Sequence, residues 1–141
     1  MWFVVNVVKV FIVICVLCCL VFLTSVRVRG TVANSSDHSL RVELEFIVDT
    51  GAIYTVIPKS VAEGLRLKET GRRKFKIANG DVVEYPISEA YIIVNGEGVT
   101  SVVAMVDEKT PLLLGVTTLE LLGLRVDPVT GKLAPLELMI L

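Results

Sequence analysis

The sequence predicts a small all-β domain, a closed barrel or a sandwich, with one or two short helices and a hydrophobic segment in front of it. Apolar and polar residues alternate with a period of two from Leu40 to Val48, as in a strand with one buried face. Asn79-Gly80 and Asn95–Gly98 each separate two β-rich runs, which is typical of hairpins. Only 58–64 and 116–123 carry helix start and stop signals.

The elements follow one another at short intervals. The expected strands, in chain order, are 26–33, 40–48, 72–78, 82–87, 91–94 and 99–106. The first helix has Pro58 near its start and Gly64 at its end. The second has Thr117 or Thr118 as its expected N-cap and ends at Gly123. Turns are expected at 34–37 and 127–131, where Asn, Asp, Ser, Pro and Gly gather.

Composition excludes several classes of protein. The chain has 141 residues, the size of one domain. Fourteen basic and 15 acidic residues leave a net charge of −1, which argues against binding nucleic acid through a basic face. The one histidine, His38, excludes a His-rich metal site, and any His-dependent hydrolase would have to be built on it.

Most of the excess hydrophobicity lies at the N-terminus. Residues 10–26 hold no charge, and a helix of about 17–25 such residues can span a bilayer. We therefore expect residues 1–25 to be a transmembrane anchor, with membrane contact through 2–26, in a single-pass protein whose domain is 26–141. The side of the membrane stays open because basic residues flank both ends. A cleaved signal segment and a buried strand behind a wrongly chosen start codon are the alternatives.

The three cysteines Cys15, Cys18 and Cys19 all fall in this hydrophobic segment. We interpret them as small apolar residues of a helix rather than metal ligands, because little else in the chain could complete a four-ligand site.

The tripeptide Asp49-Thr50-Gly51 carries the chemical signal. It ends an apolar strand, and Gly51 permits a tight turn whose N–H groups can approach an ionised carboxylate. Hydrolysis of an amide by acid–base catalysis needs one charged and one protonated carboxyl, held about 3 Å apart. The chain has a single Asp-Thr-Gly, so the second carboxyl would come from a second copy across a two-fold axis. An ordinary β-turn is the alternative interpretation.

Two segments resemble a known family. Phe46–Ala52, followed by Thr55–Pro58, is similar to the active-site segment of retropepsin-like aspartic proteases. Leu112–Gly115 and the following Thr118–Leu124 are similar to the family's second signature. Over about residues 26–141, the sequence most resembles small single-domain archaeal and bacterial aspartyl protease homologues. The resemblance implies the closed, barrel-like retropepsin fold.

It also implies roles for individual residues. Asp49 would be the catalytic aspartate, supported by Thr50, Gly51 and Ala52 in the active-site loop. Ala78, Asn79, Gly80 and Asp81 would form the flap, and Leu114 and Gly115 would pack beneath the loop. Ile53 and Tyr54 depart from the pattern, because family members often carry a polar residue there.

The expected function is that of an aspartic endopeptidase acting as a homodimer. A pair of Asp49 carboxyls would activate water against an extended peptide or protein substrate, without metal, organic cofactor or nucleic acid. The alternative is a non-catalytic module that keeps the retropepsin-like fold to dimerise or to bind peptides.

Overall fold

The computed structural model describes residues 26–141, which form nine strands and two short helices. The strands are β1 (Arg27–Asn34), β2 (Arg41–Asp49), β3 (Thr55–Pro58), β4 (Gly71–Lys76), β5 (Val82–Val94), β6 (Glu97–Val106), β7 (Leu113–Gly115), β8 (Leu124–Val126) and β9 (Leu133–Pro135). The helices are α2 (Lys59–Gly64) and α3 (Val116–Leu121).

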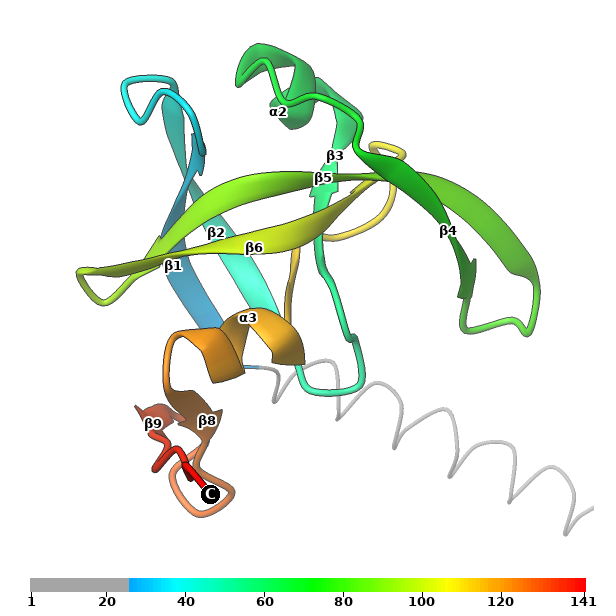
Figure 1. The fold of residues 1–141 in the computed structure, drawn as a ribbon. Helices are drawn as coiled ribbons and strands as arrows, with labels where there is room; N and C mark the ends of the chain where they lie inside the picture. The colour runs from blue at the N-terminus through cyan, green and yellow to red at the C-terminus, as the bar shows by residue number, and fades with distance from the viewer. Residues whose placement is uncertain (1–25) are drawn as a thin grey trace, which may run out of the picture.

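Six of the strands close into a barrel. The order β1-β2-β7-β3-β6-β5 returns to the start, because β1 pairs with β5 as well as with β2. Strand β4 pairs with β5 alone and projects from the barrel as one arm of a hairpin (Figure 1). Strands β8 and β9 form a separate small sheet. The predicted all-β architecture with a closed barrel and two short helices is confirmed for the described residues.

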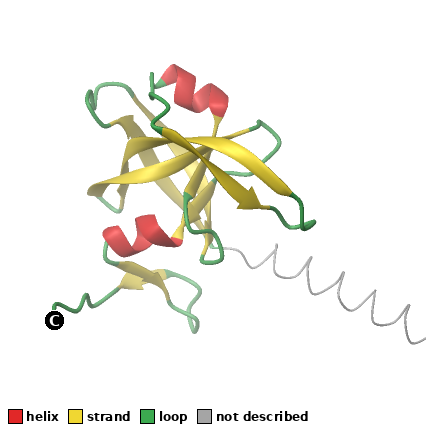
Figure 2. Ribbon diagram, turned by 45° about the vertical axis from the view of Figure 1, so that its right-hand side comes forward, coloured by secondary structure: helices red, strands yellow, loops and turns green. Residues whose placement is uncertain are grey.

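The barrel encloses an apolar core. Its largest fully buried side chains are Phe46, Ile57, Ile92, Leu114 and Leu119, which come from four strands and from α3. Burial of such side chains is the main favourable contribution to folding. Figure 2 shows α2 and α3 at opposite ends of the barrel. The loop that follows β2 lies at the end covered by α3 (Figure 1).

Strand β5 is longer than predicted. The sequence suggested separate strands over 82–87 and 91–94, but one 13-residue strand runs through Ser88-Glu89-Ala90. Pro86 obscured this continuity, because proline cannot donate to a sheet ladder. It is tolerated here since pairing with β6 begins only at Ile87. The first half of β5 therefore pairs with β4, and the second half belongs to the barrel.

The β5–β6 turn is tighter than expected. It consists of Asn95 and Gly96, with φ angles of 53° and 81°. Two positive φ values in a two-residue connection match the right-handed twist of a hairpin, and Asn-Gly adopts them readily. As a result β6 begins at Glu97 rather than at Val99.

The prediction that Thr117 or Thr118 caps the second helix is wrong. Gly115 is the N-cap and makes no side-chain capping bond. The first free N–H groups of α3 donate instead to backbone carbonyls of the loop after β2, so no side-chain cap is required. The prediction that a glycine ends the helix is correct, because Gly123 takes a φ of 67° just after it.

The predicted single-pass membrane localisation is corrected by the helices of the structure. Neither helix formed within residues 26–141 has the length and apolar character needed to cross a bilayer. The segment on which that prediction and the hydrophobic N-terminal helix rested, residues 1–25, lies outside the described residues.

Candidate active site

Asp49 is the last residue of β2 and the first residue of a tight turn that ends at Ala52. Its Oδ1 accepts a hydrogen bond of 2.9 Å from the N–H of Gly51, and its carbonyl accepts one of 3.1 Å from Ala52. The side chain is half-buried, whereas Thr50 and Gly51 are exposed. The turn thus presents a carboxylate at the barrel end, and the Gly51 N–H fixes the orientation of that carboxylate.

Strand β7 and helix α3 hold this turn from below. Asp49 pairs with Gly115 in the parallel ladder between β2 and β7. The N–H of Val116 donates to the carbonyl of Ala52 at 2.8 Å, and the N–H of Thr117 donates to that of Ile53 at 3.2 Å. The two segments of the family resemblance, 63 residues apart in the chain at Thr55 and Thr118, are therefore in direct contact.

Gly115 is in unusually close contact with the active-site loop. A Cβ added to it would lie 2.4 Å from the carbonyl carbon of Tyr54 and 2.8 Å from the carbonyl oxygen of Ile53. Real Cβ atoms do not approach backbone atoms so closely, so only glycine fits here. Leu114, the other residue assigned to the second motif, is fully buried in the core.

Three buried hydroxyls lie under the same loop, and the sequence did not predict that they form a cluster. The Oγ1 atoms of Thr55 and Thr118 are 2.7 Å apart, and the Oγ of Ser101 is 2.8 Å from that of Thr118. Thr55 Oγ1 also accepts the N–H of Gly115 at 3.1 Å. Each of the two motif segments contains a Thr, but the sequence could not show that Thr55 and Thr118 meet, nor that Ser101 on β6 joins them.

The β4–β5 hairpin carries the residues assigned to the flap. Ala78, Asn79, Gly80 and Asp81 lie in the exposed loop between the two strands. Ile77 and Asp81 close this loop through a backbone hydrogen bond of 2.9 Å, and Gly80 takes a φ of 90°. The loop is thus an ordered reverse turn at the tip of a projecting hairpin, with glycine where a positive φ is needed.

Aromatic side chains connect the hairpin with the active-site loop. The ring of Phe75 on β4 meets that of Tyr54 edge to face, with centroids 5.8 Å apart. The ring of Tyr85 on β5 is also near that of Phe75, with centroids 6.1 Å apart. Such contacts favour association of the two segments. Tyr54, which departs from the family pattern, therefore contacts the hairpin.

Tyr85 on β5 and Asp107, which follows β6, form a hydrogen-bonded pair with shifted pKa values. The hydroxyl of Tyr85 donates to Asp107 at 3.2 Å. Burial, followed by the negative charge of Asp107, raises the pKa of Tyr85. Hydrogen bonds, that from the Thr110 hydroxyl first, lower the pKa of Asp107. The effects agree in direction, because both favour a neutral tyrosine beside an ionised aspartate.

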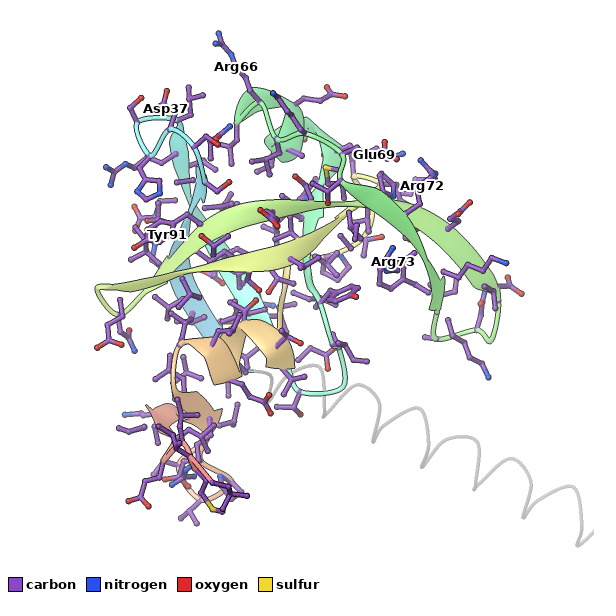
Figure 3. The ribbon with its side chains drawn as sticks, in the orientation of Figure 1. Asp37, Arg66, Glu69, Arg72, Arg73 and Tyr91 are labelled. Carbon is purple, nitrogen blue, oxygen red and sulfur yellow. The ribbon has the colours of Figure 1, made fainter. Side chains whose placement is uncertain are left out.

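Strand β4 of the hairpin carries four basic residues. Arg72 and Arg73 lie on β4, as labelled in Figure 3. Arg72 contacts Glu69 at 3.3 Å and Glu84 at 3.8 Å, but these pairs are about half exposed. Exposed ion pairs of this kind contribute little to stability. Charged side chains on an edge strand do protect it from pairing with other chains.

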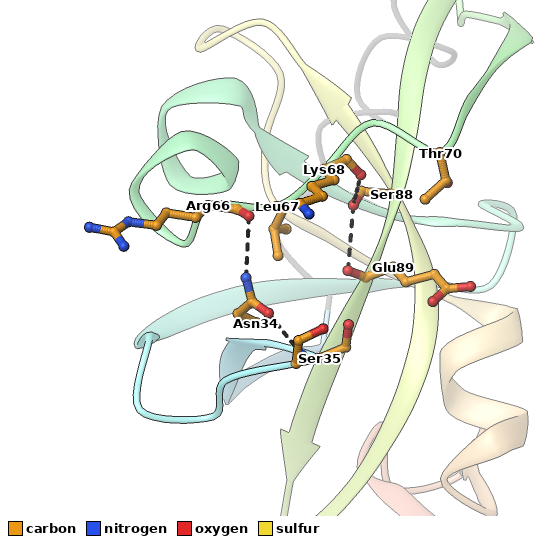
Figure 4. Close-up of a pocket in the computed structure, with 9 residues that line it drawn as sticks. Asn34, Ser35, Arg66, Leu67, Lys68, Thr70, Ser88 and Glu89 are labelled. Carbon is orange, nitrogen blue, oxygen red and sulfur yellow. Dashed lines mark hydrogen bonds between the residues drawn. The ribbon is translucent and has the colours of Figure 1, made fainter.

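A cavity of about 270 Å³ lies elsewhere, between the end of β1 and the segment that follows α2 (Figure 4). The amide of Asn34 donates to the carbonyl of Arg66 at 3.2 Å, and the hydroxyl of Ser88 donates to that of Lys68 at 2.5 Å. The guanidinium of Arg66 points away from the cavity in Figure 4. The side chains of Asn34 and Ser88 therefore fasten the segment that follows α2 to β1 and β5, which is a structural role.

Residues 26–141 contain no cluster of three or more His, Cys, Asp or Glu side chains that could hold a metal ion.

The comparisons with known proteins agree with this geometry. Residues 41–121 match the family model described as gag-polyprotein putative aspartyl protease. No curated protein matches the chain. Among solved structures the chain is similar to the "Structure of the foamy viral protease-reverse transcriptase in complex with RNA/DNA hybrid", with a TM-score of 0.53 and 18% sequence identity. That likeness covers 83% of this chain and 13% of the foamy viral chain, and at this identity it shows the fold alone.

The family match includes both the Asp49 turn and the whole of α3, the two segments that the barrel brings together. Because the match spans more than half of the 141 residues, the chain belongs to the retropepsin-like gag-polyprotein putative aspartyl protease family.

Proposed function

We propose that this chain is an aspartic endopeptidase that works as a homodimer. The observation that carries the proposal is the position of Asp49: a half-buried carboxylate in a turn fixed by Gly51, β7 and α3, at the end of the barrel that α3 covers. Fixed geometry at a reacting carboxylate is what acid–base catalysis needs. Family membership supports peptide hydrolysis as the reaction.

A second copy of the chain would supply the second carboxyl. Exposed apolar side chains near the site support this partner: Ile53 in the active-site loop is 66% exposed, and Leu121 at the end of α3 is 51% exposed. The C-terminal residues Leu138 to Leu141 are also exposed. An interface with a second copy would remove such apolar side chains from water. A two-fold axis beside Asp49 would place Ile53 in that interface and bring the two carboxyls together.

The proposed reaction uses no covalent intermediate with the enzyme. Two carboxyls about 3 Å apart share one proton, because both cannot be charged at that distance. The charged carboxylate takes a proton from water as the water oxygen attacks the carbonyl carbon, and the neutral carboxyl protonates the carbonyl oxygen. The tetrahedral intermediate then collapses: the newly charged carboxylate takes a proton from one of its hydroxyls, the newly protonated carboxyl protonates the nitrogen, and the C–N bond breaks. An acid and an amine are released, and the carboxyl pair returns to its starting state.

The substrate would bind as an extended strand between the β4–β5 hairpin and the Asp49 turns. Main-chain hydrogen bonds would hold it, and alternate side chains would point toward the hairpin and toward the floor. The aromatic contact between Phe75 and Tyr54 favours apolar substrate side chains at this point, since a bound residue would replace one ring as the partner of the other.

The test is the Asp49→Asn variant of the full chain, assayed on a peptide library by mass spectrometry. We expect cleavage to be lost while sedimentation still shows the dimer. Asn keeps the shape of the Asp side chain but cannot accept the proton from water. Glu97→Gln, the same change at an exposed carboxylate of the β5–β6 hairpin, should leave activity unchanged. Cleavage by Asp49→Asn at the wild-type rate would refute the enzymatic proposal, and a strictly monomeric active protein would refute the dimer.

A further inference from the structure

The three hydroxyls under the active-site loop form a buried polar cluster beside the apolar core. Thr55 and Thr118 are fully buried and Ser101 is 3% exposed. They come from β3, α3 and β6, so the cluster joins three elements that are distant in sequence. A buried hydroxyl is unfavourable unless it is hydrogen-bonded, whereas apolar side chains of similar size could fill the same space. Such a cluster specifies one arrangement of its elements more narrowly than apolar packing does.

Thr118 is the central member. Its Oγ1 bonds the hydroxyls of both Thr55 and Ser101, at 2.7 and 2.8 Å. Rotation or sliding of α3 would break both bonds at once, because Thr118 lies on the helix while its partners lie on barrel strands. Thr55 Oγ1 in turn accepts the N–H of Gly115 and thereby extends the chain of bonds to β7.

This chain of bonds leads directly to the catalytic turn. Gly115 is the ladder partner of Asp49. The next two N–H groups, of Val116 and Thr117, hold the carbonyls of Ala52 and Ile53. The position of the Asp49 turn therefore depends on where the start of α3 lies, and Thr118 fixes that start against the barrel.

We propose that Thr118, together with Thr55 and Ser101, is a positioning residue that sets the separation of the two Asp49 carboxyls in the dimer. The inference rests on the proposed function. A two-fold axis repeats any displacement of the loop in both copies, so a shift along the line between the carboxyls changes their separation by twice its size. Proton sharing is confined to carboxyls about 3 Å apart, and misplacement of a catalytic group by 1 Å can reduce the rate about 10²-fold.

The experiment compares three variants of the full chain. Thr118→Val removes the hydroxyl and keeps the side-chain shape, and Thr118→Ser restores the hydroxyl. Ser88→Ala is the matched control, because Ser88 is also buried, at 2% exposure, and donates to the carbonyl of Lys68 away from Asp49. For Thr118→Val we expect kcat to fall about 10- to 10²-fold with KM changed by less than about twofold. Both limbs of the pH profile should also shift, since these report the carboxyl pair.

Thr118→Ser and Ser88→Ala should keep kcat within about threefold of the wild type and leave the pH profile in place. Equal losses of kcat in Ser88→Ala and Thr118→Val, in proportion to lost stability, would show a merely structural role and overturn the proposal. A wild-type kcat and pH profile in Thr118→Val would overturn it as well.

Amide hydrogen exchange gives a readout that does not depend on activity. Thr118→Val should speed exchange at Gly115, Val116 and Thr117, and at Gly51, whose N–H bonds the Asp49 carboxylate. Ser88→Ala should not. If no peptide is cleaved by the wild type but these amides respond as expected, the proposed enzymatic function fails while the positioning role holds. If exchange at Gly51 does not respond, the hydroxyl cluster does not position the turn, whatever the activity.

Discussion

Gly115→Ala should damage the active-site loop and the fold together. A Cβ at this position would lie 2.4 Å from the carbonyl carbon of Tyr54 and 2.6 Å from its oxygen. Ordinary van der Waals contact begins at 3.4 Å, so the backbone at Tyr54 would have to retreat by about 1 Å. Neither side can yield easily, because Gly115 is fixed by the Asp49 ladder and by Thr55 Oγ1.

The size of the effect follows from that displacement. Overpacking a well-packed region costs about 1–3 kcal/mol, so we expect the free energy of unfolding to fall by about that amount. A 1 Å shift of the loop next to Asp49 should lower the kcat of the folded protein about 10²-fold. Urea unfolding followed by circular dichroism measures the first quantity, and peptide cleavage by the folded protein measures the second.

Gly64→Ala is the matched control. Gly64 ends α2, and a Cβ there would meet nothing within 4 Å. Alanine at such a position is neutral or stabilises by about 0.4–1 kcal/mol, chiefly by restricting the unfolded chain. If Gly115→Ala unfolds at the same urea concentration as Gly64→Ala, the close contact between β7 and the loop is not what holds the turn, and the reasoning fails.

Two further predictions concern stability. Asn34→Ala should lower the free energy of unfolding by about 1–3 kcal/mol in urea titrations, because the Asn34 side chain donates to the carbonyls of Leu65 and Arg66 and accepts the N–H of Ser36. Ser35→Ala is the control. An equal urea midpoint in both variants would contradict the expectation. Stability should also fall in acid. Hydrogen bonds lower the pKa values of Asp37, Asp107 and Asp127 below their ordinary value of 3.8, chiefly those from the Ser39 hydroxyl, the Thr110 hydroxyl and the Val129 N–H respectively. A lowered folded-state pKa contributes stability above the unfolded value, which is lost as pH falls through the folded value. Urea midpoints should therefore be constant from about pH 7 to 5 and decline below about pH 4; a midpoint that rises on acidification would rule out these bonds as the cause.

Local sequence patterns predicted much of the fold correctly. The alternation from Leu40 to Val48 became β2, and the glycines at 80, 96 and 123 take the positive φ angles of turns and a helix end. These features depend on a few neighbouring residues, whose intrinsic preferences decide the conformation. Where the local signal was interrupted, as by Pro86 in β5, the prediction failed because tertiary pairing outweighed propensity.

The sequence by itself determined the chemical group and its local setting: one Asp-Thr-Gly at the end of an apolar strand, in a chain whose motifs match a protease family. Only the tertiary structure decided what surrounds that group. The pairing of Asp49 with Gly115 and the meeting of Thr55, Ser101 and Thr118 join residues far apart in the chain. Closure of the barrel between β1 and β5 is likewise long-range. Such contacts depend on the register and closure of the whole sheet, which no short window of sequence encodes.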